Sequence, residues 1–123
     1  MTDLPLVHHV ELWVADLTAA VSRWEPLLLA LGCQEDQRWE RGRSWRLGGS
    51  YLVLEQNADL RRDAAYDRMG AGLNHLALRG SRDAVTTALS CGWTVRVDTG
   101  EAVHLLDGTA SRSRSFSGRP DPA

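Results

Sequence analysis

The spacing of apolar residues changes from strand-like to helical within the first thirty positions. Residues 7–14 alternate apolar and polar side chains, which is typical of a strand with one buried face. From Asp16 onward the apolar residues recur at helical spacing, and Gly32 ends that pattern. Asp16 is a favourable N-cap and Gly32 a favourable left-handed C-terminal cap, so a helix is predicted between them. Pro26 lies inside this stretch and is expected to kink or split the helix.

The same order of elements appears twice along the chain. In the first half, three short strand-like runs separated by glycine turns follow the helix, at 34–40, 44–47 and 51–56. In the second half we expect a strand at 73–78, a helix from Ser81 to Gly92, and strands at 93–97 and 101–106. The chain therefore reads β-α-β-β-β twice, and this internal repeat predicts an α+β fold of two modules.

Domain boundaries follow from the repeat. We expect a single domain at 1–108, with module one at 7–56, a polar linker at 57–71 and module two at 72–108. Residues 109–123 are atypical, because Ser, Arg and Pro dominate from Ser111 and no apolar alternation is present. This tail is predicted to be disordered, and the last strand of module two is predicted to be missing or disordered.

Composition narrows the classes of partner. The chain has 123 residues, a net charge of −2 and no basic cluster, so we expect no nucleic-acid and no membrane partner. No apolar run approaches the roughly 18 residues of a spanning helix, and the first residues do not resemble a signal peptide. Cys33 and Cys91 have no metal-type spacing and are interpreted as reduced thiols. These features predict a cytoplasmic protein whose partner is a small molecule.

Polar residues inside the predicted strands are the candidates for chemistry. Because side chains alternate along a strand, His9, Glu55 and His75 each lie opposite an apolar helix-packing face. Two imidazoles and a carboxylate suit a divalent metal such as Zn, Ni, Mn, Fe or Co. The alternative is that the imidazoles are structural and Glu55 lies on a solvated sheet face.

Further residues are predicted to surround these three. By strand parity His8 is expected at the surface rather than in the site. The candidate substrate-pocket residues are Glu11, Trp13, Tyr51 and His104.

Three segments resemble the vicinal-oxygen-chelate superfamily, which includes glyoxalases, bleomycin-resistance proteins and extradiol dioxygenases. The segments are His9-Val-Glu-Leu-Trp-Val-Ala-Asp-Leu17, Tyr51-Leu-Val-Leu-Glu55 and Gly72-Leu-Asn-His75-Leu-Ala-Leu. The resemblance implies paired βαβββ modules in a cupped, partly open mixed sheet, with helices on the outer face. It also implies that His9, Glu55 and His75 are metal ligands, that Glu55 can shuttle a proton, and that the metal binds paired oxygens of the substrate.

The end of the chain departs from that family pattern. Family members end in D-x-D-G-[FY]-x-x-E, whose Glu is the fourth ligand, whereas no acid follows Gly108 here until Asp121. We interpret the tail as a frameshift product, because one inserted base in plausible codons after Asp107 restores the family ending. The restored Glu would overlay Ser113 or Arg114. The metal is therefore expected to be sub-stoichiometric and the activity impaired.

Several classes of function stay open at this point. The first is a metal-dependent enzyme of the lyase or isomerase, dioxygenase or transferase type, acting on a small oxygenated molecule. The alternative is a metal-free drug-binding protein of the bleomycin-resistance type, or an inactive pseudoenzyme. A homodimer is open as well, because the family pairs its modules within one chain or across two.

Overall fold

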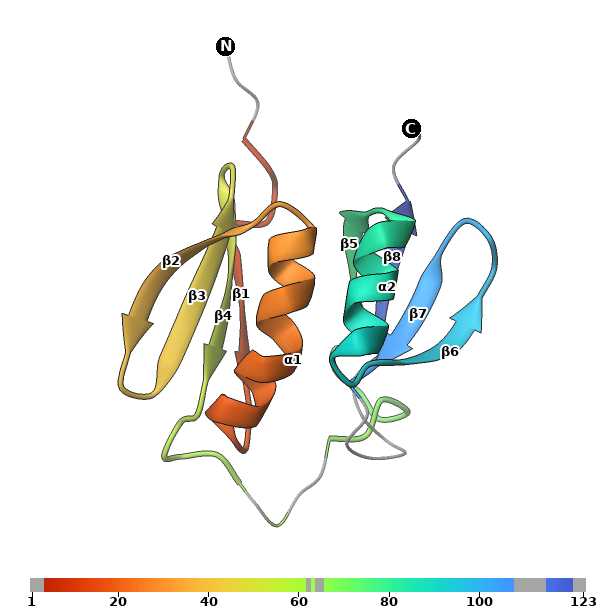
Figure 1. The fold of residues 1–123 in the computed structure, drawn as a ribbon. Coiled ribbons are helices and arrows are strands. Elements are labelled where there is room, and N and C mark those ends of the chain that lie inside the picture. Colours follow the sequence, from red (N-terminus) through yellow and green to blue (C-terminus); the bar gives the residue numbers. More distant parts are fainter. Residues whose placement is uncertain (1–3, 62, 64–65, 108–114, 121–123) are drawn as a thin grey trace. The chain divides into compact units, whose positions relative to one another are not determined.

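The computed structural model describes residues 4–61, 63 and 66–107, together with the backbone of 115–120 (Figure 1). The chain divides into two compact units, Met1–Arg62 and Asp63–Ala123. The boundary lies inside the linker expected at 57–71. Each unit is described by itself below.

Unit 1 is a four-stranded mixed sheet with one helix. Its elements, in chain order, are β1 His9–Trp13, α1 Leu17–Ala30, β2 Gln34–Trp39, β3 Gly42–Leu47 and β4 Ser50–Glu55. The strand order is β1-β4-β3-β2, in which β1 and β4 are parallel and the other pairs antiparallel. Helix α1 follows β1 and leads into β2, the first strand of the antiparallel β2-β3-β4 meander.

The ends of α1 follow the capping residues. The Asp16 carboxylate accepts a hydrogen bond from the Ala19 amide (3.1 Å), and Gly32 takes a left-handed φ of +97° after the last turn. The predicted split at Pro26 is wrong, because a single helix runs through this residue to Ala30.

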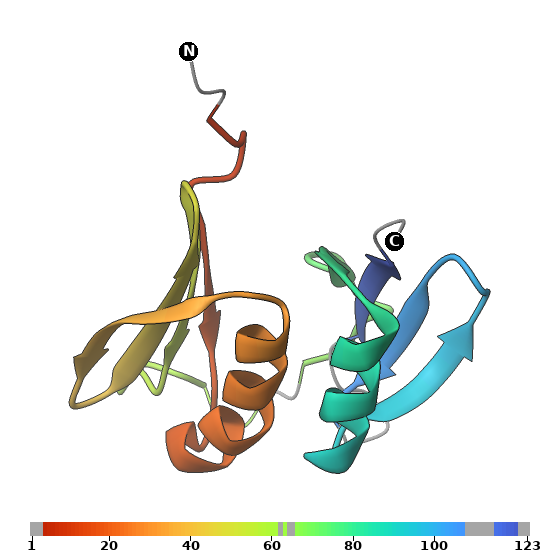
Figure 2. The ribbon, with the colours of Figure 1, turned by 45° about the horizontal axis from the view of Figure 1, so that its top comes forward.

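The core of unit 1 lies between α1 and one face of the sheet (Figure 2). Its buried apolar side chains are Leu12, Ala20, Trp24, Leu27, Leu28, Trp45, Leu52 and Leu54. Trp45 is only 1% exposed, and its indole Nε1–H donates to Glu25 Oε2 at 3.0 Å. The opposite face of the sheet therefore carries the candidate residues.

Unit 2 repeats this arrangement. Its elements, in chain order, are β5 His75–Gly80, α2 Arg82–Ser90, β6 Thr94–Asp98, β7 Val103–Leu106 and β8 Ser115–Pro120. The strand order is β5-β8-β7-β6, which matches β1-β4-β3-β2 of unit 1 position by position. Ser81 caps α2 through the Ala84 amide (3.3 Å). The buried apolar residues are Ala84, Ala88, Trp93, Val103 and Leu105.

The α+β fold of two βαβββ modules is thus confirmed, but the prediction of a missing last strand is wrong. β8 lies in the middle of its sheet, parallel to β5 from His75–Ser115 to Gly80–Pro120 and antiparallel to β7. A sheet ladder joins backbone N–H and C=O groups, so a segment without apolar alternation can still fill a central position. The disordered tail is therefore corrected for 115–120, and its remaining residues lie outside the described part.

Candidate functional site

In unit 1 the helix-free face of the sheet holds the predicted residues of the first module. His9, Glu11 and Trp13 of β1 lie on this face, next to Tyr51 and Glu55 of β4. The residues between them, including Leu12 and Leu54, point to the buried side. The parity predicted for both strands is confirmed.

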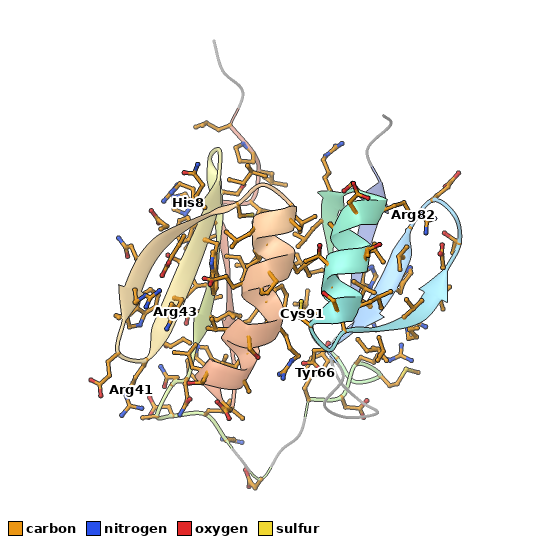
Figure 3. All side chains as sticks on the ribbon, in the orientation of Figure 1. His8, Arg41, Arg43, Tyr66, Arg82 and Cys91 are labelled. Atoms are coloured by element: carbon orange, nitrogen blue, oxygen red, sulfur yellow. The ribbon has the colours of Figure 1, made fainter. Side chains whose placement is uncertain are left out.

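His9 and Glu55 share this face but are not neighbours on it. His9 pairs with Tyr51, whereas Glu55 pairs with Trp13, four positions further along β1. At about 3.3 Å per residue the two Cα atoms are roughly 13 Å apart along the strands. In Figure 3, His8, the neighbour of His9 in the chain, is labelled near one end of this sheet and Arg41 near the other. Within unit 1 the two side chains do not form an adjacent ligand pair.

The His9 end of this face is aromatic. The imidazole of His9 stacks on the Tyr51 ring with centroids 4.7 Å apart and planes 8° apart. The Arg46 guanidinium lies over the same Tyr51 ring at 4.8 Å, a cation–π contact. His8 is exposed as expected, but its Nδ1 lies 2.9 Å from Nδ1 of His9, so one of the two rings donates to the other.

The Glu55 end is held by two N–H donors. Trp39 Nε1–H donates to Oε1 of Glu55 at 3.4 Å, and Asn57 Nδ2–H donates to Oε2 at 2.8 Å. The Trp39 ring lies against Gly42, where an added Cβ would be 2.4 Å from the ring and 2.8 Å from the Leu54 carbonyl oxygen. Gly42 thus leaves the space that lets Trp39 reach Glu55.

A substitution of Gly42 by Ala tests this arrangement. The new Cβ overlaps the Trp39 ring and the Leu54 backbone, so the indole has to move away from Glu55. We expect a loss of about 1–3 kcal/mol in unfolding free energy and a shift in tryptophan emission. Urea unfolding followed by fluorescence measures both. Gly70→Ala is the control, because its nearest neighbour would be Asp67 O at 3.4 Å. Equal stability of the two variants would contradict the packing described here.

Trp13 and Glu11 form a second indole–carboxylate contact on the same face. Trp13 Nε1–H donates to Oε2 of Glu11 at 2.7 Å, and the Trp13 side chain is 38% exposed. Trp39 is similarly 37% exposed. Two half-exposed indoles, each bonded to a carboxylate, make this face both aromatic and acidic.

In unit 2, hydrogen bonds fix the proton position on His75. The Asn74 amide nitrogen donates to the Arg68 carbonyl at 2.8 Å, so its Oδ1 is the atom that lies 2.8 Å from Nδ1 of His75. An amide oxygen only accepts, so Nδ1 carries the proton and Nε2 keeps its lone pair. This is the orientation in which an imidazole binds a metal or takes up a proton through Nε2.

His104 lies beside His75 with the opposite tautomer. Their ring centroids are 5.8 Å apart at an angle of 60°. Arg96 Nη2 lies 3.3 Å from Nδ1 of His104, and since a guanidinium only donates, Nδ1 accepts and Nε2 carries the proton. Partial burial, then the Arg96 charge and His75, hold the pKa of His104 below its ordinary value.

The structure leaves the three-residue metal site as a prediction. His9 and Glu55 belong to unit 1 and His75 to unit 2, and no group of three His, Cys, Asp or Glu side chains that could hold a metal is found among the described residues. Four side chains that contact the candidate residues were not predicted from the sequence: Trp39, Asn57, Asn74 and Arg96. Strand parity could have indicated Trp39, and the position of Asn74 beside His75 was a signal for a hydrogen-bonded partner.

The register also identifies the residue that corresponds to Glu55 in unit 2. Glu55 pairs with the residue four positions after His9, and the residue four positions after His75 is Arg79, which pairs with Arg119. The corresponding position is therefore occupied by an arginine rather than a carboxylate. Ser113 and Arg114, where a restored Glu was expected, lie outside the described residues.

The structure also describes the two cysteines and the helices that bear on the expectations of free thiols and of no membrane partner. Cys33 and Cys91 are both free, and burial raises the pKa of the Cys33 thiol. In the part of the chain that the structure describes, no helix is long and apolar enough to cross a membrane.

The fold is similar to that of solved proteins of one group. A "putative glyoxalase" from Bacillus halodurans is 28% identical, with a TM-score of 0.79 over 94% of this chain and 96% of that one. A glyoxalase/bleomycin resistance protein from Albidiferax ferrireducens T118 is 16% identical, with a TM-score of 0.73 over 96% and 100%.

Comparison of sequences adds one curated relative. The uncharacterized protein YqjT of Bacillus subtilis (strain 168) is 42% identical over 71 residues, which are 58% of this chain. The matched part is 56% of that relative's length. No family model matches the chain of this protein.

Proposed function

We propose that the chain is a member of the vicinal-oxygen-chelate superfamily and a metal-dependent enzyme acting on a small oxygenated molecule, which its similarity to a solved putative glyoxalase supports. Lyase or isomerase, dioxygenase and transferase reactions are all open within this class. A divalent metal, Zn, Ni, Mn, Fe or Co, would supply Lewis-acid activation of paired substrate oxygens. Binding, orientation of the substrate and proton transfer would depend on side chains of the protein.

The observation that carries this proposal is the state of His75. Its Nδ1–H is held by Asn74, which is itself oriented by the Arg68 carbonyl, so the Nε2 lone pair is left for a ligand. Hydrogen bonds of this kind orient metal-binding histidines in general. We propose His75 as an imidazole ligand, with His9 and Glu55 as the further ligands of the superfamily pattern.

The donor set fits a divalent metal in its chemistry but not fully in its placement. Two imidazoles and a carboxylate are suitable donors. His9 and Glu55, however, are separated by four register positions, and Glu55 already accepts two hydrogen bonds. Each of the two oxygens already accepts one hydrogen bond, so in this proposal a metal or a proton shares the carboxylate with Trp39 and Asn57.

The same separation favours a second candidate, a metal-free protein that binds a planar molecule. Trp13 and Trp39 offer half-exposed rings on one sheet face, and Glu11 and Glu55 add negative charge there. Rings of this kind give a large contact area at a low cost in side-chain entropy. The position equivalent to Glu55 in unit 2 holds Arg119, which also fits a protein without a four-ligand site.

Metal titration separates the two candidates. The full-length protein, dialysed against a chelator, is titrated with Ni²⁺, Zn²⁺ and Mn²⁺ by calorimetry. We expect binding at one site or fewer per chain, weakened by about 10–100-fold in Asn74→Ala and by more in His75→Ala.

His104→Ala is the matched control, because it removes a neighbouring imidazole that the metal proposal does not use. An unchanged affinity in His75→Ala, or the absence of metal binding by the unmodified protein, would overturn the metal-dependent enzyme. Quenching of tryptophan emission by bleomycin in the metal-free protein, lost in Trp13→Ala, would then support the second candidate.

A further inference from the structure

We infer that His104 and Arg96, with His75 beside them, form a binding site for an anionic oxygen group on the helix-free face of unit 2. The ligands that fit are a hydrogen phosphate or a carboxylate with a neighbouring hydroxyl group. The inference goes beyond the proposed function, since it names an anionic small molecule as the class of ligand and concerns the protein without a metal on Nε2 of His75.

The donors of this site are set by the contact between Arg96 and His104. The guanidinium of Arg96 occupies the acceptor of the imidazole, at 3.3 Å from Nδ1, and this leaves Nε2–H as the free donor. Arg96 has further N–H groups on the same guanidinium. The Nε2–H of His104 and the remaining N–H groups of the Arg96 guanidinium are thus available to an anionic oxygen.

The acceptor of the site comes from His75. Its Nδ1–H is bonded to Asn74 Oδ1, so the free atom of this ring is a lone pair on Nε2. With ring centroids 5.8 Å apart, the two imidazoles lie near enough for one small ligand to contact both. A ligand that carries both an O–H and an anionic oxygen can donate to His75 and accept from His104. Hydrogen phosphate and 2-hydroxycarboxylates have this combination.

The charges on the strands of unit 2 agree with an anionic ligand. Arg79 lies four residues after His75 on β5, so the two side chains are on the same face of the strand. Asp98 is the single carboxylate on the four strands of unit 2, and it pairs in register with Val103, which is buried on the helix side. Arg82 also holds Asp98, with Nη1 at 2.8 Å from Oδ2. No described strand residue therefore places negative charge beside the two histidines.

The inference is tested with inorganic phosphate and with lactate on the metal-free, full-length protein at constant ionic strength. Imidazole ¹⁵N NMR first reports the tautomers, which we expect to be Nδ1–H for His75 and Nε2–H for His104. Each anion is then titrated, and both signals are expected to shift. Arg96→Gln and His104→Ala should each weaken binding by about tenfold or more, as hydrogen bonds to charged groups do.

Arg38→Gln is the matched control, because it removes the same charge from unit 1, where Arg38 is paired with Glu35 at 2.9 Å. Unfolding midpoints of all variants show that the fold is retained. A Nδ1–H tautomer on His104, absence of binding by either anion, or equal weakening by Arg38→Gln would overturn the inference. Binding of lactate alone would assign the carboxylate source, and binding of phosphate alone the phosphate source.

This experiment contains no metal, so its outcome is separate from that of the metal titration. Loss of metal binding together with retained phosphate binding would remove the proposed enzyme and keep the anion site. The reverse pattern would remove the anion site and keep the enzyme.

Discussion

Truncation of the chain after Asp107 is expected to unfold unit 2 and to leave unit 1 folded. β8 fills the centre of its sheet, so its loss separates β5 from β7 and leaves both with unpaired backbone groups. Unit 1 has its own sheet and its own helix-covered core, and none of its strands pairs with β8. The expected result is a loss of amide protection in His75–Gly80, Thr94–Asp98 and Val103–Leu106, with protection unchanged in β1 to β4.

Hydrogen–deuterium exchange read by mass spectrometry measures this difference segment by segment. Truncation after Pro120 is the control, because it removes the last three residues and keeps β8. Equal protection of β5 and β7 in the two truncated chains would show that β8 does not hold the sheet together.

Replacement of Trp45 by Ala is expected to cost about 3–5 kcal/mol of unfolding free energy in unit 1. Trp45 is 1% exposed between α1 and the sheet, so its removal opens a cavity among the core side chains. It also leaves Glu25, on α1, without the indole donor at 3.0 Å. Urea denaturation followed by far-ultraviolet circular dichroism measures the loss.

Two companion variants divide the effect of Trp45 into its parts. Trp45→Phe keeps most of the ring volume but removes the N–H, and Glu25→Gln keeps an acceptor without the charge. We expect both to cost less than Trp45→Ala, because burial of the ring contributes more than one hydrogen bond. A cost below about 1 kcal/mol for Trp45→Ala would contradict its place in the core.

Local signals in the sequence were sufficient for most of the fold. The period-two pattern at 7–14 predicted β1, and Asp16 and Ser81 predicted the helix starts, because capping depends on residues three positions apart. Of the kink or split expected at Pro26, the split does not occur, because a protein helix is stabilised mainly by the packing of its apolar face and can continue through a proline. β8 was missed because its place is fixed by its two neighbouring strands rather than by its own composition.

The candidate site was predictable residue by residue but not as an arrangement. Alternation along β1 and β4 correctly placed His9, Glu11, Trp13, Tyr51 and Glu55 on one face. It could not supply the register between the two strands, and it is the register that separates His9 from Glu55. Likewise, the tautomers of His75 and His104 depend on Asn74 and Arg96, whose side-chain contacts no sequence pattern specifies.

The bond between Trp39 and Glu55 gives the protein a built-in optical reporter. The emission of an indole responds to a carboxylate at its N–H, and Trp39 lies at one while it is 37% exposed to solvent. Any ligand that binds the Glu55 carboxylate has to displace the Trp39 indole or share the Glu55 oxygen with it. Occupancy of that end of the sheet can therefore be followed in the unlabelled protein, and Trp39→Phe identifies the part of the emission that comes from this indole.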